Sequence, residues 1–171
     1  MTNAEAASEE QLPLAAVEEH PRLAGLLRYW QKQRGERRMP PRRDMLPEEM
    51  SGFLGYIVLV DVTPPPRRFR FRLVGTEITN AYGRDLTGLY VDDITTVAYR
   101  DILLDHYGRA ADGAEPVLHR LRFVEWPGRV HELVRLTLPL SDDDRTVNML
   151  MLISSFGDEL KGHRRPLLGR D

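Results

Sequence analysis

The segment from Phe69 to Gly88 constrains the fold of this chain most strongly, because it predicts a strand, a helix and the breaks between them. In its first half, large apolar residues alternate with arginines, which is the two-residue period of a half-buried β-strand. Gly75 then ends the strand, and Thr76 is suited to cap the start of a helix. Gly83 is suited to end that helix in the left-handed conformation. The residues in this segment shape the backbone and provide no chemistry.

Four further segments read as strands. Residues 57–62 and 147–153 are apolar at nearly every position, which is typical of strands covered on both faces. Residues 116–125 and 129–140 alternate more, and Pro127-Gly128 between them predicts a hairpin turn. We therefore predict an α+β fold with a five-stranded antiparallel sheet. Its first and last strands pair at the centre, and the helices that follow the second strand cover one face.

A flanking helix precedes this sheet. It is predicted to begin near Pro21 and to run to Gly35, and one apolar stripe lies along it, formed by Leu23, Leu26, Leu27 and Trp30. The stripe must cover either the sheet of the same chain or a second subunit, and both alternatives stay open at this point. We expect these four residues to contact a partner protein or a second copy of the chain, in a homodimer.

The chain divides into four parts. Residues 1–12 are small, acidic and without apolar periodicity, so we predict a disordered tail. Residues 13–46 hold the flanking helix and a linker rich in proline and arginine, and residues 47–157 form the domain. Residues 158–171 are predicted to be a mobile basic tail.

Composition narrows the function classes. A formal net charge of −2 argues against a general binder of polyanions, so we consider nucleic acid an unfavourable partner. The absence of cysteine excludes disulfides, thiolate metal sites and cysteine nucleophiles, and it suits the reducing cytoplasm, where we expect the protein to act. We see neither a membrane-spanning run nor a signal peptide, and we expect no membrane partner.

Four residues are candidates for binding a small ligand. His106 lies on the helical stripe that faces the sheet, and it is either a ligand in a pocket, such as a haem ligand, or a hydrogen-bonded core histidine. Asn148 interrupts the last apolar strand, and its amide either meets a ligand or lies near solvent at the strand end. Tyr82 and Tyr99 are placed to line the same cavity or to serve as core aromatics.

No catalytic set is visible in the sequence. Adjacent Asp105 and His106 do not face each other on a helix, and Ser154-Ser155 lacks a nucleophile motif. The aspartates 142–144 read as a solvated turn because they lack the spacing of a calcium loop. We expect no enzyme and no metal site, and the sequence identifies no cofactor. A small enzyme and a nucleic-acid binder are the less favoured alternatives.

Several short motifs follow one another along the chain in an order and spacing that are typical of a known family. They are Met39-Pro40, Arg43-Asp44, Pro47-Glu48, Arg72–Thr76, Gly83–Gly88, Gly113–Pro116 and Leu138–Leu140. Together with the order of strands and helices, they resemble the PAS domain, and in particular the small bacterial PAS proteins that carry no fused output domain. The resemblance covers about residues 20–156.

The resemblance implies a sensory or protein-interaction module. PAS domains bind haem, flavin, small organic acids or nothing, and they often dimerise through a helix that flanks the core. The resemblance transfers no catalytic set. It implies a signalling module that acts through protein contacts and responds to a small ligand between sheet and helices. The alternative it leaves is a sensor that binds haem or another cofactor through His106.

Overall fold

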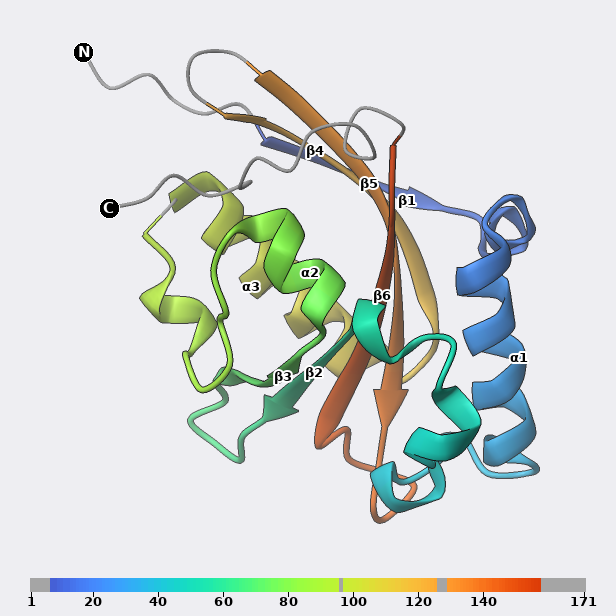
Figure 1. Ribbon diagram of the computed structural model, residues 1–171. Helices are drawn as coiled ribbons and strands as arrows, with labels where there is room; N and C mark the ends of the chain where they lie inside the picture. Colours follow the sequence, from blue (N-terminus) through green and yellow to red (C-terminus); the bar gives the residue numbers. More distant parts are fainter. Residues whose placement is uncertain (1–6, 96, 126–128, 158–171) are drawn as a thin grey trace.

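The computed structural model describes residues 7–95, 97–125 and 129–157, with the side chains of Tyr82 and of residues 123–131 left outside that description. Three α-helices and six β-strands make up most of it (Figure 1). The helices are α1 (Pro21–Arg34), α2 (Thr76–Tyr82) and α3 (Val97–Gly113). The strands are β1 (Ala7–Leu12), β2 (Ile57–Val62), β3 (Phe69–Val74), β4 (Val117–Glu125), β5 (Arg129–Leu140) and β6 (Met149–Phe156). Short 3-10 helices span Leu14–Glu19, Arg42–Asp44, Pro47–Met50, Leu54–Tyr56 and Val91–Asp93.

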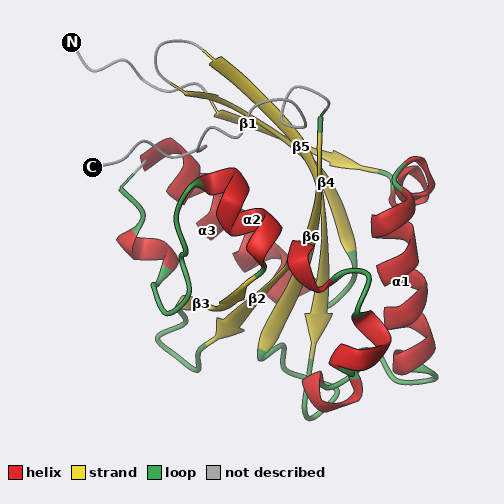
Figure 2. Ribbon diagram, in the orientation of Figure 1, coloured by secondary structure: helices red, strands yellow, loops and turns green. Residues whose placement is uncertain are grey.

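The strands form one antiparallel sheet in the order β1-β4-β5-β6-β2-β3. β2 and β6, the two segments that are apolar on both faces, are direct neighbours, which confirms the predicted central pairing. Helices α2 and α3 cover one face of the sheet and α1 covers the other (Figures 1 and 2). The α+β class, the antiparallel sheet and the flanking helix are therefore confirmed.

Strand β1 corrects the prediction for the N-terminal segment. Residues 7–12 were expected to be disordered, and instead they pair with β4 at the edge of the sheet, with Ala7 opposite Phe123 and Leu12 opposite Leu118. Main-chain hydrogen bonds hold an edge strand, so it does not need the apolar side chains that the sequence lacks there. The sheet thus has six strands in place of five.

Helix α1 packs against the chain's own sheet. Leu23, Leu26, Leu27 and Trp30 are all buried, and the indole Nε1 of Trp30 donates a 3.0 Å hydrogen bond to the carbonyl oxygen of Pro139 in β5. The apolar stripe therefore covers the sheet of the same chain, which is one of the two alternatives that the sequence left open. The partner contact expected at these four residues needs correcting, because their surface is already covered by β5 and β6.

The glycine before α2 lies where the backbone is most crowded. A Cβ at Gly75 would lie 2.4 Å from the carbonyl oxygen of Gly55, and the Gly75 N–H donates to the carbonyl oxygen of Ile57 at 2.8 Å. Gly75 itself precedes the first turn and Thr76 makes no capping hydrogen bond, so the predicted threonine cap is displaced by one residue. Gly83 ends the helix with a left-handed φ of 75°, as predicted.

The turn before β6 is built around an aspartate. The Oδ1 atom of Asp143 accepts hydrogen bonds from the backbone N–H groups of Thr146 and Arg145, at 2.7 and 2.9 Å, and from the Ser141 hydroxyl. These bonds lower the pKa of Asp143 from 3.8 to about 2. The aspartates therefore organise a turn.

This turn gives a pH-dependent contribution to stability. A carboxyl group with a lowered pKa in the folded state stabilises the fold above its unfolded-state pKa, and the contribution is lost as the pH falls through the folded-state pKa. We expect the free energy of unfolding to fall between about pH 4 and pH 2, and to fall less in Asp143→Asn. Urea unfolding of both proteins over this range is the measurement, and equal slopes would contradict the assignment.

None of the helices within the described ranges is both long enough and apolar enough to cross a lipid bilayer.

Candidate functional site

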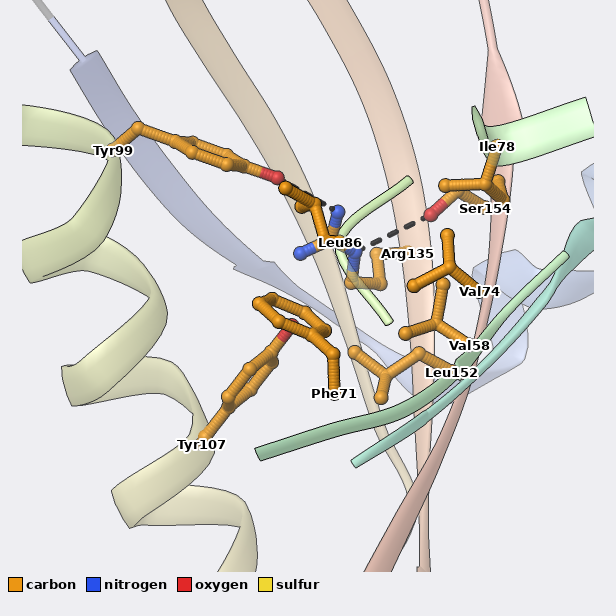
Figure 3. Close-up of a pocket in the computed structure, with 10 residues that line it drawn as sticks. All are labelled: Val58, Phe71, Val74, Ile78, Leu86, Tyr99, Tyr107, Arg135, Leu152 and Ser154. Carbon is orange, nitrogen blue, oxygen red and sulfur yellow. Dashed lines mark hydrogen bonds between the residues drawn. The ribbon is translucent and has the colours of Figure 1, made fainter. Parts of the chain in front are cut away.

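A small cavity lies between the sheet and the helices α2 and α3 (Figure 3). Its walls are mostly apolar and carry four side chains with polar atoms. The lining residues are Val58, Phe71, Val74, Ile78, Leu86, Tyr99, Tyr107, Arg135, Leu152 and Ser154. Its volume is about 20 Å³, which is close to the room that one buried water needs.

Arg135 places a cation in this wall. It belongs to β5 and pairs with His119 of β4 on one side and with Ser154 of β6 on the other, so all three side chains are on the α3 face of the sheet. Arg135 as a whole residue is only 5% exposed. Nε donates to the Ser154 hydroxyl at 3.3 Å, and Nη2 donates to the Tyr99 hydroxyl at 3.4 Å (Figure 3). These bonds orient the guanidinium at the cavity.

A second polar group lies beside the cavity on the same face. His106 of α3 is completely buried, with Nδ1 at 2.7 Å from Glu9 Oε1 and Nε2 at 2.7 Å from Thr137 Oγ1. His119 of β4 lies beside it, with ring centroids 4.2 Å apart, and its Nε2 is 3.2 Å from the same oxygen of Glu9. Glu9 comes from β1, so three separate elements meet here.

The charges of this group are set by burial, by the hydrogen bond between Glu9 and His106, and by the neighbouring charges. Arg109 donates to Glu9 Oε2 at 2.6 Å and is itself paired with Asp105. Burial raises the pKa of Glu9, but the hydrogen bond with His106 and the surrounding positive charges outweigh it and lower that pKa overall. Burial lowers the pKa of both histidines, that of His119 to about 4 with the nearby His106 adding to the effect. Near neutral pH the group therefore holds two neutral imidazoles and one carboxylate.

The four residues that the sequence suggested as ligand-binding candidates do not form one site. Tyr99 is buried and lines the cavity, where its hydroxyl meets Arg135. His106 is buried on the predicted face of α3 but contacts Glu9 and Thr137. Asn148 lies just before β6, where its amide binds the backbone N–H and the carboxylate of Asp142. The side chain of Tyr82 lies outside the described part of the chain.

The haem alternative required His106 to face a large cavity. The lining residues of the cavity do not include His106, and both of its ring nitrogens lie 2.7 Å from protein oxygens. The cavity's volume of about 20 Å³ is far below the several hundred Å³ of a cofactor site. In this conformation the site does not fit haem.

Sequence reasoning missed Arg135, His119 and Glu9. Arg135 and His119 do carry a signal, because each is a polar residue at an inward position of a strand whose neighbours are buried and apolar. Glu9 carried none, because nothing in residues 7–12 predicted a strand.

Comparison with known proteins supports the resemblance. The family model described as the PAS domain matches residues 18–154. Among solved structures, the PAS domain of a protein from Colwellia psychrerythraea is similar at 11% sequence identity with a TM-score of 0.48, covering 67% of this chain and 98% of that one. No curated protein matches the chain. Because the family model spans most of its length, this chain belongs to the PAS domain family, whose members serve generally as sensory and signalling modules.

Proposed function

We propose that this protein is a cytoplasmic sensory module that binds a small anionic ligand at Arg135 and signals by changing its contacts with a partner protein or a second copy. The observation that carries the proposal is the guanidinium of Arg135 in the wall of the cavity between sheet and helices. The absence of cysteine supports the cytoplasmic location.

The chemistry of the wall favours an anion. A planar guanidinium binds a carboxylate through two parallel hydrogen bonds, and such charge-assisted bonds are stronger when water is excluded. Ser154 and Tyr99 hold the group in place and add hydroxyls that donate to the same anion. The remaining walls are apolar, which suits a carboxylate with a short hydrocarbon part.

Because the cavity is small, an acid can bind in it only if part of the cavity wall moves. A cavity of about 20 Å³ has no room for acetate or a larger acid, so a bound acid must displace part of the wall. Helix α3 packs on β1, β5 and β6, whereas the main contact of α2 is with the 3-10 helix Leu54–Tyr56. The part of the wall free to move is therefore the segment that carries Ile78 in α2 and Leu86 after it. Ligand binding would then favour a state with α2 displaced, and this difference in affinity shifts the population that a partner contacts.

The test uses a panel of short carboxylates: acetate, propionate, malonate and benzoate. We expect at least one to raise the thermal midpoint of the wild type, because a ligand that binds only the folded state stabilises it. Arg135→Met should weaken binding by about ten- to a hundredfold, since a hydrogen bond to a charged group contributes about 1.5–3 kcal/mol. Calorimetric titration measures both affinities.

Arg122→Met is the matched control, because Arg122 is an exposed arginine of the neighbouring strand β4. It should leave binding unchanged. Adding the acid should change the hydrogen-exchange rates of residues 76–95 in the proteins that bind the acid, and it should leave these rates unchanged in a variant that does not bind. Equal affinity in Arg135→Met and the wild type, or no binding by any acid of the panel, would overturn the proposed ligand class.

A further inference from the structure

The group formed by Glu9, His106 and His119 has the composition of a metal site. One carboxylate oxygen and two imidazole nitrogens, one from each residue, lie within 4.8 Å of one another. The three residues come from β1, α3 and β4, and their side chains are buried, with Glu9 at 11% side-chain exposure the most accessible. Two imidazoles and a carboxylate are ligands that Zn²⁺ prefers.

His119 supplies an independent observation. Its ring is 3% exposed, and within the described residues neither of its nitrogens makes a hydrogen bond of acceptable geometry. Its Nε2 nevertheless lies only 3.2 Å from Glu9 Oε1. Buried polar atoms are almost always satisfied by protein, water or an ion, so this nitrogen requires a further partner.

The distances fit a small cation. Glu9 Oε1 is 2.7 Å from His106 Nδ1 and 3.2 Å from His119 Nε2, and ligand atoms around tetrahedral zinc are about 3.3 Å apart. The two histidine nitrogens lie within 4.8 Å of each other, so binding requires Glu9 to draw back from His106 and the two imidazoles to adjust around the ion.

The surrounding residues match what a metal site needs. Metal-bound histidines usually donate their second N–H to an oxygen, and His106 Nε2 lies 2.7 Å from the hydroxyl of Thr137, so it can donate there and leave Nδ1 for the metal. Arg109 holds the second oxygen of Glu9 at 2.6 Å, which orients the carboxylate. The charge of Arg109 opposes a cation, but Asp105 at 2.9 Å partly offsets it.

We propose that Glu9 Oε1, His106 Nδ1 and His119 Nε2 bind one Zn²⁺ ion, with a water at the fourth position. The ion joins β1 to α3 and β4. Since β1 lies outside residues 18–154 that match the PAS family model, the site is formed by the domain together with its N-terminal extension. The proposal does not depend on the carboxylate site at Arg135.

The first experiment titrates the full chain, after treatment with a chelator, with Zn²⁺ in competition with a chromophoric indicator. We expect one ion per chain. Glu9→Gln and His119→Gln each change a proposed metal ligand, so each should weaken binding by more than about tenfold. Thr137→Val removes the hydrogen-bond partner of His106, and it should weaken binding by about tenfold, because such partners of metal ligands contribute on that scale. His20→Gln is the control, because His20 lies outside the group, and it should leave the affinity unchanged.

A second measurement keeps the test valid if a variant unfolds. Long-range nitrogen–proton NMR of the wild type reports the tautomer of each histidine. With Zn²⁺, His106 should carry its proton on Nε2 and His119 on Nδ1, and Co²⁺ in place of Zn²⁺ should show the visible absorption of a tetrahedral site. Absence of stoichiometric binding, or binding that His20→Gln weakens and Glu9→Gln and His119→Gln leave intact, would overturn the proposal.

Discussion

Replacing Trp30 with alanine should lower the free energy of unfolding by about 3–5 kcal/mol, the usual cost of deleting a large buried aromatic side chain. Trp30 is 1% exposed between α1 and the sheet. Its Nε1–H also donates to the Pro139 carbonyl oxygen at 3.0 Å, and this oxygen loses its donor in the variant. Urea unfolding monitored by circular dichroism measures the difference.

Two further variants separate the causes. Trp30→Phe keeps an aromatic ring but removes the N–H, so it should cost less than the alanine variant, with about 1–3 kcal/mol for the unpaired carbonyl. Gln31→Ala changes an exposed residue of the same helix and should stay within about 0.5 kcal/mol of the wild type. A loss of stability that depended on protein concentration would instead indicate that Trp30 contacts a second subunit.

The second large effect is expected at Gly75. Its φ of −61° and ψ of 153° suit any residue, so the cost of Gly75→Ala is purely steric. The new Cβ would lie 2.4 Å from the carbonyl oxygen of Gly55 and 2.7 Å from that of Leu54, and backbone atoms cannot rotate away. We expect the free energy of unfolding to fall by at least about 3 kcal/mol, at the upper end of the usual cost of overpacking.

Gly52→Ala is the matched control, because nothing lies within 4 Å of the Cβ that it would add. It should leave stability unchanged or raise it by about 0.4–1 kcal/mol, since alanine restricts the unfolded chain. Thermal and urea unfolding of both variants compare them directly. Similar midpoints for Gly75→Ala and Gly52→Ala would show that the segment after β3 can move away from residues 54–55.

The sheet could be predicted because its pattern is local. The period of two in Phe69–Val74 and the two-sided apolar runs of β2 and β6 each lie within a few consecutive residues. The pairing of β2 with β6 followed from burial on both faces. Strand β1 could not be predicted, because its hydrogen bonds to β4 use backbone atoms and place no demand on sequence.

The polar groups were harder to predict for a related reason. Glu9 and His106 are 97 residues apart, and nothing local to either residue shows that they meet. Arg135 was recognisable in principle as a charge at an inward position of a buried strand, but its partners Tyr99 and Ser154 come from other elements. The register of β4, β5 and β6 brings His119, Arg135 and Ser154 into one row, and α3 adds Tyr99 from above it.

The register of β5 limits which insertions and deletions the protein can tolerate. Arg135 and Thr137 are two residues apart in β5, so both point to the α3 face, one at the cavity and one at His106. A shift of β5 by one residue would turn both to the α1 face and bring Leu136 in their place. One insertion or deletion in β5 before Arg135 would therefore turn Arg135 away from the cavity and Thr137 away from His106 together.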